Sequence, residues 1–142
     1  MAADLRLRRA FPAPVDQVWQ GLTDQAALAQ WFWPARFGTV AEVDLRTGGR
    51  FRIDGTAGGI AVSGRYVAIE RPSRLSFTWI WDGKPEETLV TAELAPAGPG
   101  TELNLTHEGF ADETERDEHV VGWTDCLDRL PAWLASPGIF SG

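Results

Sequence analysis

The stretch that decides the fold of this chain is Glu42-Val-Asp-Leu-Arg-Thr-Gly-Gly-Arg-Phe-Arg-Ile53. Within it, two runs that alternate apolar and charged residues meet at Gly48-Gly49, a dipeptide typical of tight turns. Successive side chains of a strand point to opposite faces, so each run would have one apolar face and one charged face. The stretch therefore predicts a β-hairpin with strands at Glu42–Leu45 and Arg50–Asp54.

The strand pattern continues on both sides of the hairpin. Alternating runs separated by turns that contain glycine or proline predict further strands over Asp4–Phe11, Ile60–Glu70, Arg74–Trp81, Glu87–Ala95 and Thr101–Gly109. Leu5 and Leu7 are expected to point inward, and Gly64 is a candidate for a bend in the longest of these strands. A continuous sheet of this length is expected to curl.

Helical spacing fills the two remaining parts of the chain. Before the hairpin, apolar residues at helical intervals predict a short helix that starts near Pro14, and Asp24 is expected to cap a second one. After the last strand, a long helix is expected to begin at Asp112 or Thr114. Its apolar stripe comprises Val120, Trp123, Leu127, Leu130 and Leu134. Pro131 is expected to kink this helix or to end its regular part.

The order of these elements predicts an α+β fold in a single domain spanning residues 1–142. A curved antiparallel sheet of about six to seven strands would wrap around the long C-terminal helix, with two short helices after the first strand. The C-terminal helix is the one element long enough to cover the concave face of the sheet. Coverage by one helix would leave a gap of roughly 300–1,000 Å³, the size of a pocket for a small ligand.

The composition argues against several classes of partner. The 142 residues carry a net charge of −7, and twelve of the thirteen cationic residues are scattered arginines. This distribution argues against binding to nucleic acid or to an anionic membrane. No apolar run approaches the roughly 18 residues of a membrane-inserted helix. Cys126 is the one cysteine, so no disulfide or cysteine-based metal site is expected, and a reducing cytoplasmic location is favoured.

Aromatic residues are the main candidates for a ligand-binding surface. The chain has seven tryptophans and seven phenylalanines, more than a small two-layer core needs. Indole rings often line cavities or interfaces, because their N–H groups need a partner or water. The residues expected to line the pocket are Trp31, Phe51, Phe77, Trp79, Trp81, Leu105, His107, Trp123 and Leu127. Phe32 and Trp33 extend this aromatic set, and plain packing in the core is the alternative for each ring.

His107 is the candidate for polar chemistry. It shares a strand face with Leu103 and Leu105, so it would face the cavity if the leucines do. An imidazole there could orient the polar head of a ligand or act as an acid–base group. The alternative is a histidine at the cavity rim that is hydrogen-bonded to a neighbour. His119, on the long helix, could approach His107 across the cavity mouth.

Other kinds of chemistry find no support in the sequence. A metal site would need a third ligand beside the two histidines, and no recognised ligand spacing supplies one. There is no nucleophile signature and no glycine-rich loop that cradles phosphate, so no cofactor is expected.

Eight segments of the chain, taken together, resemble one known family. They are Phe11-Pro-Ala-Pro-Val-Asp-Gln-Val-Trp19, Leu22-Thr-Asp24, Leu28-Ala-Gln-Trp-Phe32, Val43-Asp-Leu-Arg-Thr-Gly-Gly-Arg50, Gly64-Arg-Tyr66, Arg74-Leu-Ser-Phe-Thr-Trp79, Thr101-Glu-Leu-Asn-Leu-Thr-His-Glu-Gly-Phe110 and His119-Val-Val-Gly-Trp123. The chain is similar over Leu5 to Leu134 to homologues of the activator of the heat-shock protein 90 ATPase, in the START/SRPBCC superfamily. The resemblance implies the helix-grip fold. Pro131 departs from it, because similar proteins usually continue the helix there.

Three functions remain open at this point. The first is a non-enzymatic protein that binds a small hydrophobic molecule between the sheet and the C-terminal helix. The second is an interaction module that docks on a chaperone or on another protein. The third is an enzyme of the cyclase or hydrolase kind with His107 as its base. The sequence leaves open whether the protein is a monomer or a homodimer.

Overall fold

The computed structural model describes residues 3–135, which form seven strands and three α-helices. The strands are β1 (Ala3–Phe11), β2 (Val40–Val43), β3 (Arg50–Gly55), β4 (Ile60–Glu70), β5 (Arg74–Trp81), β6 (Thr88–Ala97) and β7 (Gly100–Phe110). The helices are α1 (Val15–Thr23), α2 (Gln25–Trp31) and α3 (Glu113–Leu134), and two 3-10 turns lie at η1 (Ala35–Phe37) and η2 (Thr56–Gly58). The predicted order of strands and helices is confirmed.

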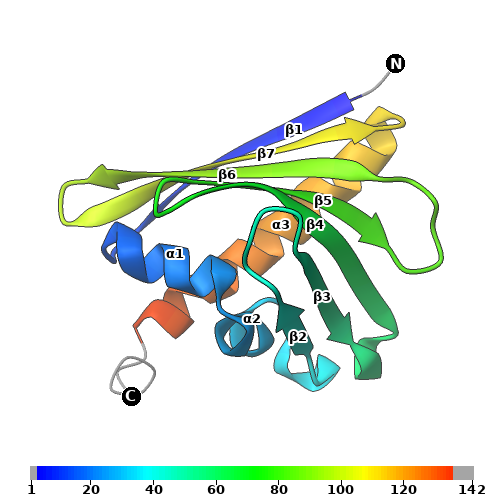
Figure 1. The fold of residues 1–142 in the computed structure, drawn as a ribbon, viewed down its shortest axis with the longest axis horizontal. Coiled ribbons are helices and arrows are strands. Elements are labelled where there is room, and N and C mark those ends of the chain that lie inside the picture. The colour runs from blue at the N-terminus through cyan, green and yellow to red at the C-terminus, as the bar shows by residue number, and fades with distance from the viewer. Residues whose placement is uncertain (1–2, 136–142) are drawn as a thin grey trace.

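The strands of the described range belong to one antiparallel sheet with the order β1-β7-β6-β5-β4-β3-β2. The sheet is curved, and α1, α2 and α3 all lie on its concave side (Figure 1). The predicted helix-grip α+β fold is confirmed. One expectation is wrong, because α3 does not cover the concave face alone. The helices α1 and α2 pack against α3 and against strands of the sheet, so they fill part of the concave side that was expected to be empty.

The opening hairpin forms between β2 and β3, with Val43 paired to Phe51. Phe51 and Ile53 are buried, whereas Arg50 is exposed, so the predicted apolar and charged faces are confirmed. Strand β2 ends at Val43 rather than at Leu45. The chain leaves the ladder there and reaches β3 through a six-residue loop (residues 44–49) in which Gly48 has a φ of 83°, a conformation that favours glycine.

Two aspartates cap helices: Asp24, as predicted, and Asp112, one of the two residues at which the long helix was expected to begin. The Asp24 carboxylate accepts a hydrogen bond of 3.0 Å from the backbone N–H of Ala27 at the start of α2. The Asp112 carboxylate accepts one of 2.8 Å from the backbone N–H of Glu115 at the start of α3. Each cap satisfies one of the N–H groups that a helix leaves unpaired in its first turn.

Pro131 lies inside α3, so of its two expected effects, a kink or the end of the regular helix, the second is wrong. The helix continues to Leu134, although a proline at this position cannot donate to the carbonyl of Leu127. Trp133 and Leu134, in the turn that follows, are both buried. Burial of these two side chains offsets the hydrogen bond that Pro131 cannot make.

Gly64 lies where two strands of the sheet approach closely. It is opposite Phe51 in the β3–β4 ladder. A Cβ atom at Gly64 would overlap the carbonyl oxygen of Thr78 on β5 and would lie 2.8 Å from Cε1 of Phe51. The irregularity of β4 falls between Tyr66 and Ala68, two residues beyond the bend expected at Gly64. Glycine is required here because the neighbouring backbone leaves no room for a side chain.

Candidate functional site

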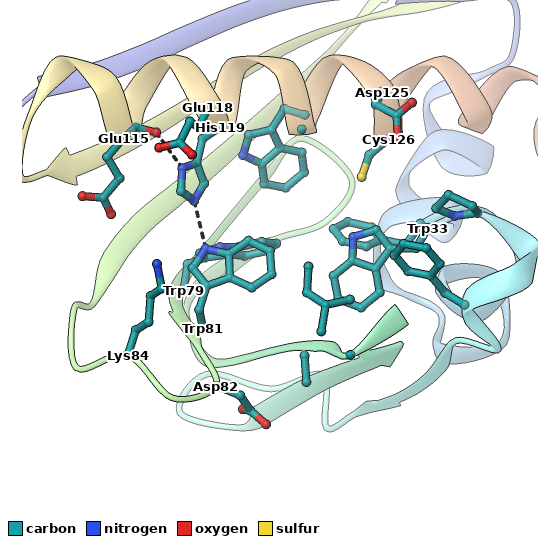
Figure 2. A pocket seen from close by; sticks show the side chains of 18 of the residues that line it. Trp33, Trp79, Trp81, Asp82, Lys84, Glu115, Glu118, His119, Asp125 and Cys126 are labelled. Atoms are coloured by element: carbon teal, nitrogen blue, oxygen red, sulfur yellow. Dashed lines mark hydrogen bonds between the residues drawn. The ribbon is translucent and has the colours of Figure 1, made fainter. Parts of the chain in front are cut away.

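One hollow lined by several aromatic rings, here named the outer groove, has a volume of about 570 Å³. It lies between the first half of α3, the ends of β4 and β5, and the segment that follows α2 (Figure 2). Its apolar lining includes Phe32, Trp33, Phe37, Ile60, Trp79 and Trp81. Its charged lining consists of Arg36, Asp82, Lys84, Glu115, Glu118 and Asp125. The groove therefore has a ring-lined interior and charged groups around it.

A second hollow, the inner cavity, lies deeper between the sheet and the helices. Its volume is about 40 Å³, close to the ~30 Å³ that one water molecule occupies in the liquid. The deep part of the space between sheet and helices is therefore much smaller than the roughly 300–1,000 Å³ of a ligand pocket, and the hollow of that size between β5 and α3 is the outer groove. Rings fill the space instead. Phe51 packs edge-on against Phe77 with a centroid distance of 5.2 Å, and Trp79 lies 5.2 Å from Trp123.

The predicted lining residues divide between these two hollows. Those that line the outer groove are Trp79, Trp81 and Trp123. Those that line the inner cavity but not the outer groove are Trp31, Phe51, Phe77 and Leu105. His107 and Leu127 are fully buried and line neither hollow.

Many groove residues are missing from the predicted set, and Gly122 and Cys126 on α3 are two of them. Together with His119 they lie at i, i+3 and i+7 along α3, the spacing of one helical face. That spacing is the sequence signal that could have identified them.

His107 is held by hydrogen bonds at both ring nitrogens. The indole N–H of Trp123 donates to Nδ1 at 3.0 Å, so the ring proton resides on Nε2, which donates to the Thr88 hydroxyl at 2.6 Å. That hydroxyl donates in turn to the carbonyl of Trp79 at 3.3 Å. Burial, followed by the charge of His119, lowers the pKa of His107 to about 3. The ring is therefore neutral near pH 7 and has no free lone pair to offer a substrate.

His119 approaches His107 as predicted, with a centroid distance of 5.3 Å. Its Nδ1–H donates to the carbonyl oxygen of Glu115 at 2.8 Å, which leaves Nε2 as an acceptor. The indole N–H of Trp81 donates to this Nε2 at 2.9 Å (Figure 2). His119 therefore fixes Trp81 as one wall of the outer groove.

Arg129 fixes the opposite end of the groove. Its guanidinium donates to the carbonyl oxygens of Trp31 at 3.1 Å and Phe32 at 2.8 Å, groups that the end of α2 leaves without helical partners. It also pairs with the Asp125 carboxylate at 2.6 Å. One side chain of α3 thereby positions the end of α2, and with it Phe32 and Trp33.

Cys126 is a thiol rather than a reactive thiolate. The side chain is buried, and burial raises the pKa of the thiol to about 12. A group that stays protonated near pH 7 is a weak nucleophile and a weak metal ligand. Among residues 3–135, no group of three or more histidine, cysteine, aspartate or glutamate side chains is arranged to hold a metal ion.

Trp79 lies between the two hollows and lines both. Its side chain is 4% exposed, and within residues 3–135 no acceptor lies within hydrogen-bonding reach of its indole N–H. A buried donor without an acceptor costs roughly 1–3 kcal/mol. The other tryptophans whose N–H bonds are described here, Trp31, Trp81 and Trp123, all have acceptors.

The fold and the ring-lined groove place the molecule among helix-grip proteins with an open hollow beside the long helix. The family model described as "Activator of Hsp90 ATPase homolog 1-like protein" matches residues 12–135, and the chain belongs to this family. No curated protein matches the sequence. In the described range, none of the helices is both long enough and apolar enough to span a membrane.

Solved structures share this fold over almost the whole chain. Protein CV1439 from Chromobacterium violaceum is 29% identical with a TM-score of 0.79, and the match covers 94% of this chain and 97% of that one. CalU16 from Micromonospora echinospora is 33% identical with a TM-score of 0.75, covering 97% and 79%. DynU16, from the dynemicin biosynthetic locus, is 28% identical with a TM-score of 0.81, covering 94% and 47%. This chain thus spans about half the length of DynU16.

Proposed function

We propose that this protein binds a small, predominantly apolar molecule in the outer groove. The observation that carries the proposal is a hollow of about 570 Å³ lined by aromatic rings, within the range of roughly 300–1,000 Å³ usual for small-molecule sites. The rings supply apolar contact area, and the charged residues around them remain in reach of water. His119 and Arg129 hold the two ends of the groove in place, which reduces the ordering that a ligand would have to impose.

Binding rather than catalysis fits the polar groups near the groove. Both nitrogens of His107 and both of His119 already have hydrogen-bond partners. The Cys126 thiol remains protonated, because burial raises its pKa. A general base or nucleophile needs an available lone pair, and these three side chains do not offer one in this arrangement.

One relative supports a small molecule as the occupant. DynU16 is described as a protein in the dynemicin biosynthetic locus, a setting compatible with a small-molecule occupant. The similarity covers nearly the whole of this chain but about half of DynU16, so it supports a class of ligand rather than a particular compound.

Filling the outer groove from α3 is expected to abolish binding. Gly122 lines the groove, and a Cβ placed there meets no described atom within 4 Å apart from its chain neighbours and the nearby backbone of its own helix. Gly122→Leu should therefore insert a side chain into the groove without a clash and weaken ligand binding roughly tenfold or more. We would titrate oleate, naringenin and 9-fluorenone against the protein and follow tryptophan fluorescence.

The matched control is Val121→Leu, on the same helix. Val121 is 71% exposed and does not line the groove, so this variant should bind as the wild type does. Gly122→Leu should also unfold at a slightly higher urea concentration, because leucine favours a helix over glycine by roughly 0.8 kcal/mol. Equal affinities of the wild type and Gly122→Leu for every compound that binds would refute the outer groove as the site.

A second candidate function is docking on a chaperone or another protein. The family's description names an activator of Hsp90 ATPase. The strand β2 is at one edge of the sheet, and Val40 on it is 57% exposed, a surface suited to pairing with another chain. This candidate predicts that a protein partner captured by the wild type is captured equally well by Gly122→Leu.

A further inference from the structure

We propose that the indole N–H of Trp79 is the recognition group of the site, and that the ligand is a flat, neutral molecule with a carbonyl oxygen that accepts from it. This inference rests on the proposed binding function and names the chemical class of the ligand. It begins from a buried donor that the fold leaves without an acceptor, at the boundary between the outer groove and the inner cavity.

The two hollows share one wall. Phe32, Trp79 and Trp123 line both of them. The ring centroid of Phe32 lies 6.1 Å from that of Trp79 and 5.9 Å from that of Trp123. A ligand in the outer groove is therefore separated from the inner cavity by a layer of three rings. Trp79 carries the unpartnered donor of that layer.

The surroundings of Trp79 explain why the protein does not satisfy this donor itself. The rings around it are Phe32, Phe51, Phe77, Trp81, His107 and Trp123. His107 is the one ring among them with acceptor nitrogens, and its acceptor Nδ1 already receives the N–H of Trp123. An acceptor for Trp79 must therefore come from outside the described chain, either as water or as an atom of a ligand.

Phe32 is the member of the shared wall that can move to admit a ligand atom. Trp123 is tied to His107 by a hydrogen bond of 3.0 Å, and Trp79 belongs to β5, which is paired on both sides within the sheet. The Phe32 ring has no polar tether, because Arg129 holds its backbone carbonyl rather than its side chain. Rotation of this ring would join the outer groove to the inner cavity beside Trp79.

The chemistry of the site selects a neutral acceptor. The inner cavity is lined by Leu22, Leu28, Ile53, Leu75 and aromatic rings, and an ion loses most of its hydration in such surroundings. The groove also carries four acidic side chains (Asp82, Glu115, Glu118 and Asp125) against two basic ones (Arg36 and Lys84), a net negative charge that disfavours a carboxylate. The ligand atom must accept a hydrogen bond from Trp79 and must be uncharged. A ketone or quinone oxygen on a flat ring system has both properties.

The test compares 9-fluorenone with fluorene, which share a ring skeleton and differ in the carbonyl group. Wild-type protein is expected to bind fluorenone about tenfold more tightly, the effect of pairing a buried donor. Trp79→Phe, which keeps an aromatic ring and removes the N–H, should bind both compounds with equal affinity. Trp19→Phe is the matched control. Trp19 is buried and lines neither the outer groove nor the inner cavity, so the preference for the ketone should remain.

A second measurement does not depend on any variant. In a ¹⁵N–¹H spectrum of the wild type, the indole proton of Trp79 should move downfield with fluorenone and not with fluorene. Phe32→Ala should speed the association of fluorenone several-fold, because the ring that closes the wall is gone.

The outcomes separate the two proposals. Equal binding of both compounds by the wild type, or a ketone preference that survives Trp79→Phe, would overturn the inference and leave the groove as a general apolar site. Failure of both compounds and of oleate and naringenin to bind would overturn the proposed function as well.

Discussion

Gly64→Ala is expected to lower the free energy of unfolding by about 4 kcal/mol or more, the range in which single substitutions are exceptional. The added methyl group would overlap the carbonyl oxygen of Thr78 and crowd Cε1 of Phe51. The first of these atoms is backbone and cannot rotate away, so β4 and β5 would have to separate. Trp79 belongs to β5 and lines the outer groove. Separation of β4 from β5 would therefore disturb the groove as well.

Urea denaturation followed by tryptophan fluorescence would measure the effect. Gly122→Ala is the matched control, because a Cβ there meets open space and alanine favours the helix by about 1 kcal/mol. The two glycine-to-alanine changes should therefore shift the midpoint in opposite directions. A midpoint of Gly64→Ala equal to that of the wild type would show that the two strands adjust easily and that the close approach has little energetic weight.

Acidification from pH 7 to pH 5 is expected to cost about 2 kcal/mol of stability through His107 alone. Burial, followed by the charge of His119, lowers the pKa of this residue from its ordinary 6.5 to about 3 in the folded protein. Below pH 6.5 the unfolded chain takes up a proton that the folded protein does not. The contribution is therefore fully present above pH 6.5 and is lost progressively as the pH falls toward 3.

His107→Gln isolates this effect. A glutamine side chain can accept from Trp123 and donate to Thr88, but it does not titrate. We expect the urea midpoint of the wild type to fall more steeply between pH 7 and pH 5 than that of His107→Gln, by an amount that corresponds to about 2 kcal/mol. Parallel pH profiles of the two proteins would mean that His107 takes up a proton in the folded state, contrary to its buried, doubly bonded arrangement.

The local features of the fold could be predicted from the sequence because they depend on residues that are close along the chain. The Gly48 turn sets the hairpin, and Asp24 and Asp112 cap the helices that follow them. The strand Arg74–Trp81 has the predicted bounds. The possible helix end at Pro131 was wrong because the burial of Trp133 depends on the position of α1, where Gly21 leaves room for the indole ring.

The candidate site was only partly predictable, because it depends on packing between distant segments. Alternation along β7 placed His107 on the face of Leu103 and Leu105, but its partner Trp123 lies on another element. The volume left between the sheet and the helices depends on how much of the concave face α1 and α2 cover. The spacing of apolar residues along the sequence does not determine that coverage. The unpaired N–H of Trp79 is a property of the assembled rings and has no counterpart in the sequence pattern.

The close spacing of the rings in the shared wall has an optical consequence. The centroid of Trp79 lies 5.2 Å from that of Trp123 and 5.4 Å from that of Trp81, and the excited states of indoles so close together mix. The folded protein should therefore show a bisignate exciton band in its circular dichroism, whose amplitude follows the angles between the rings. The circular dichroism of the unlabelled protein would then be a direct measure of how the rings of the shared wall are oriented.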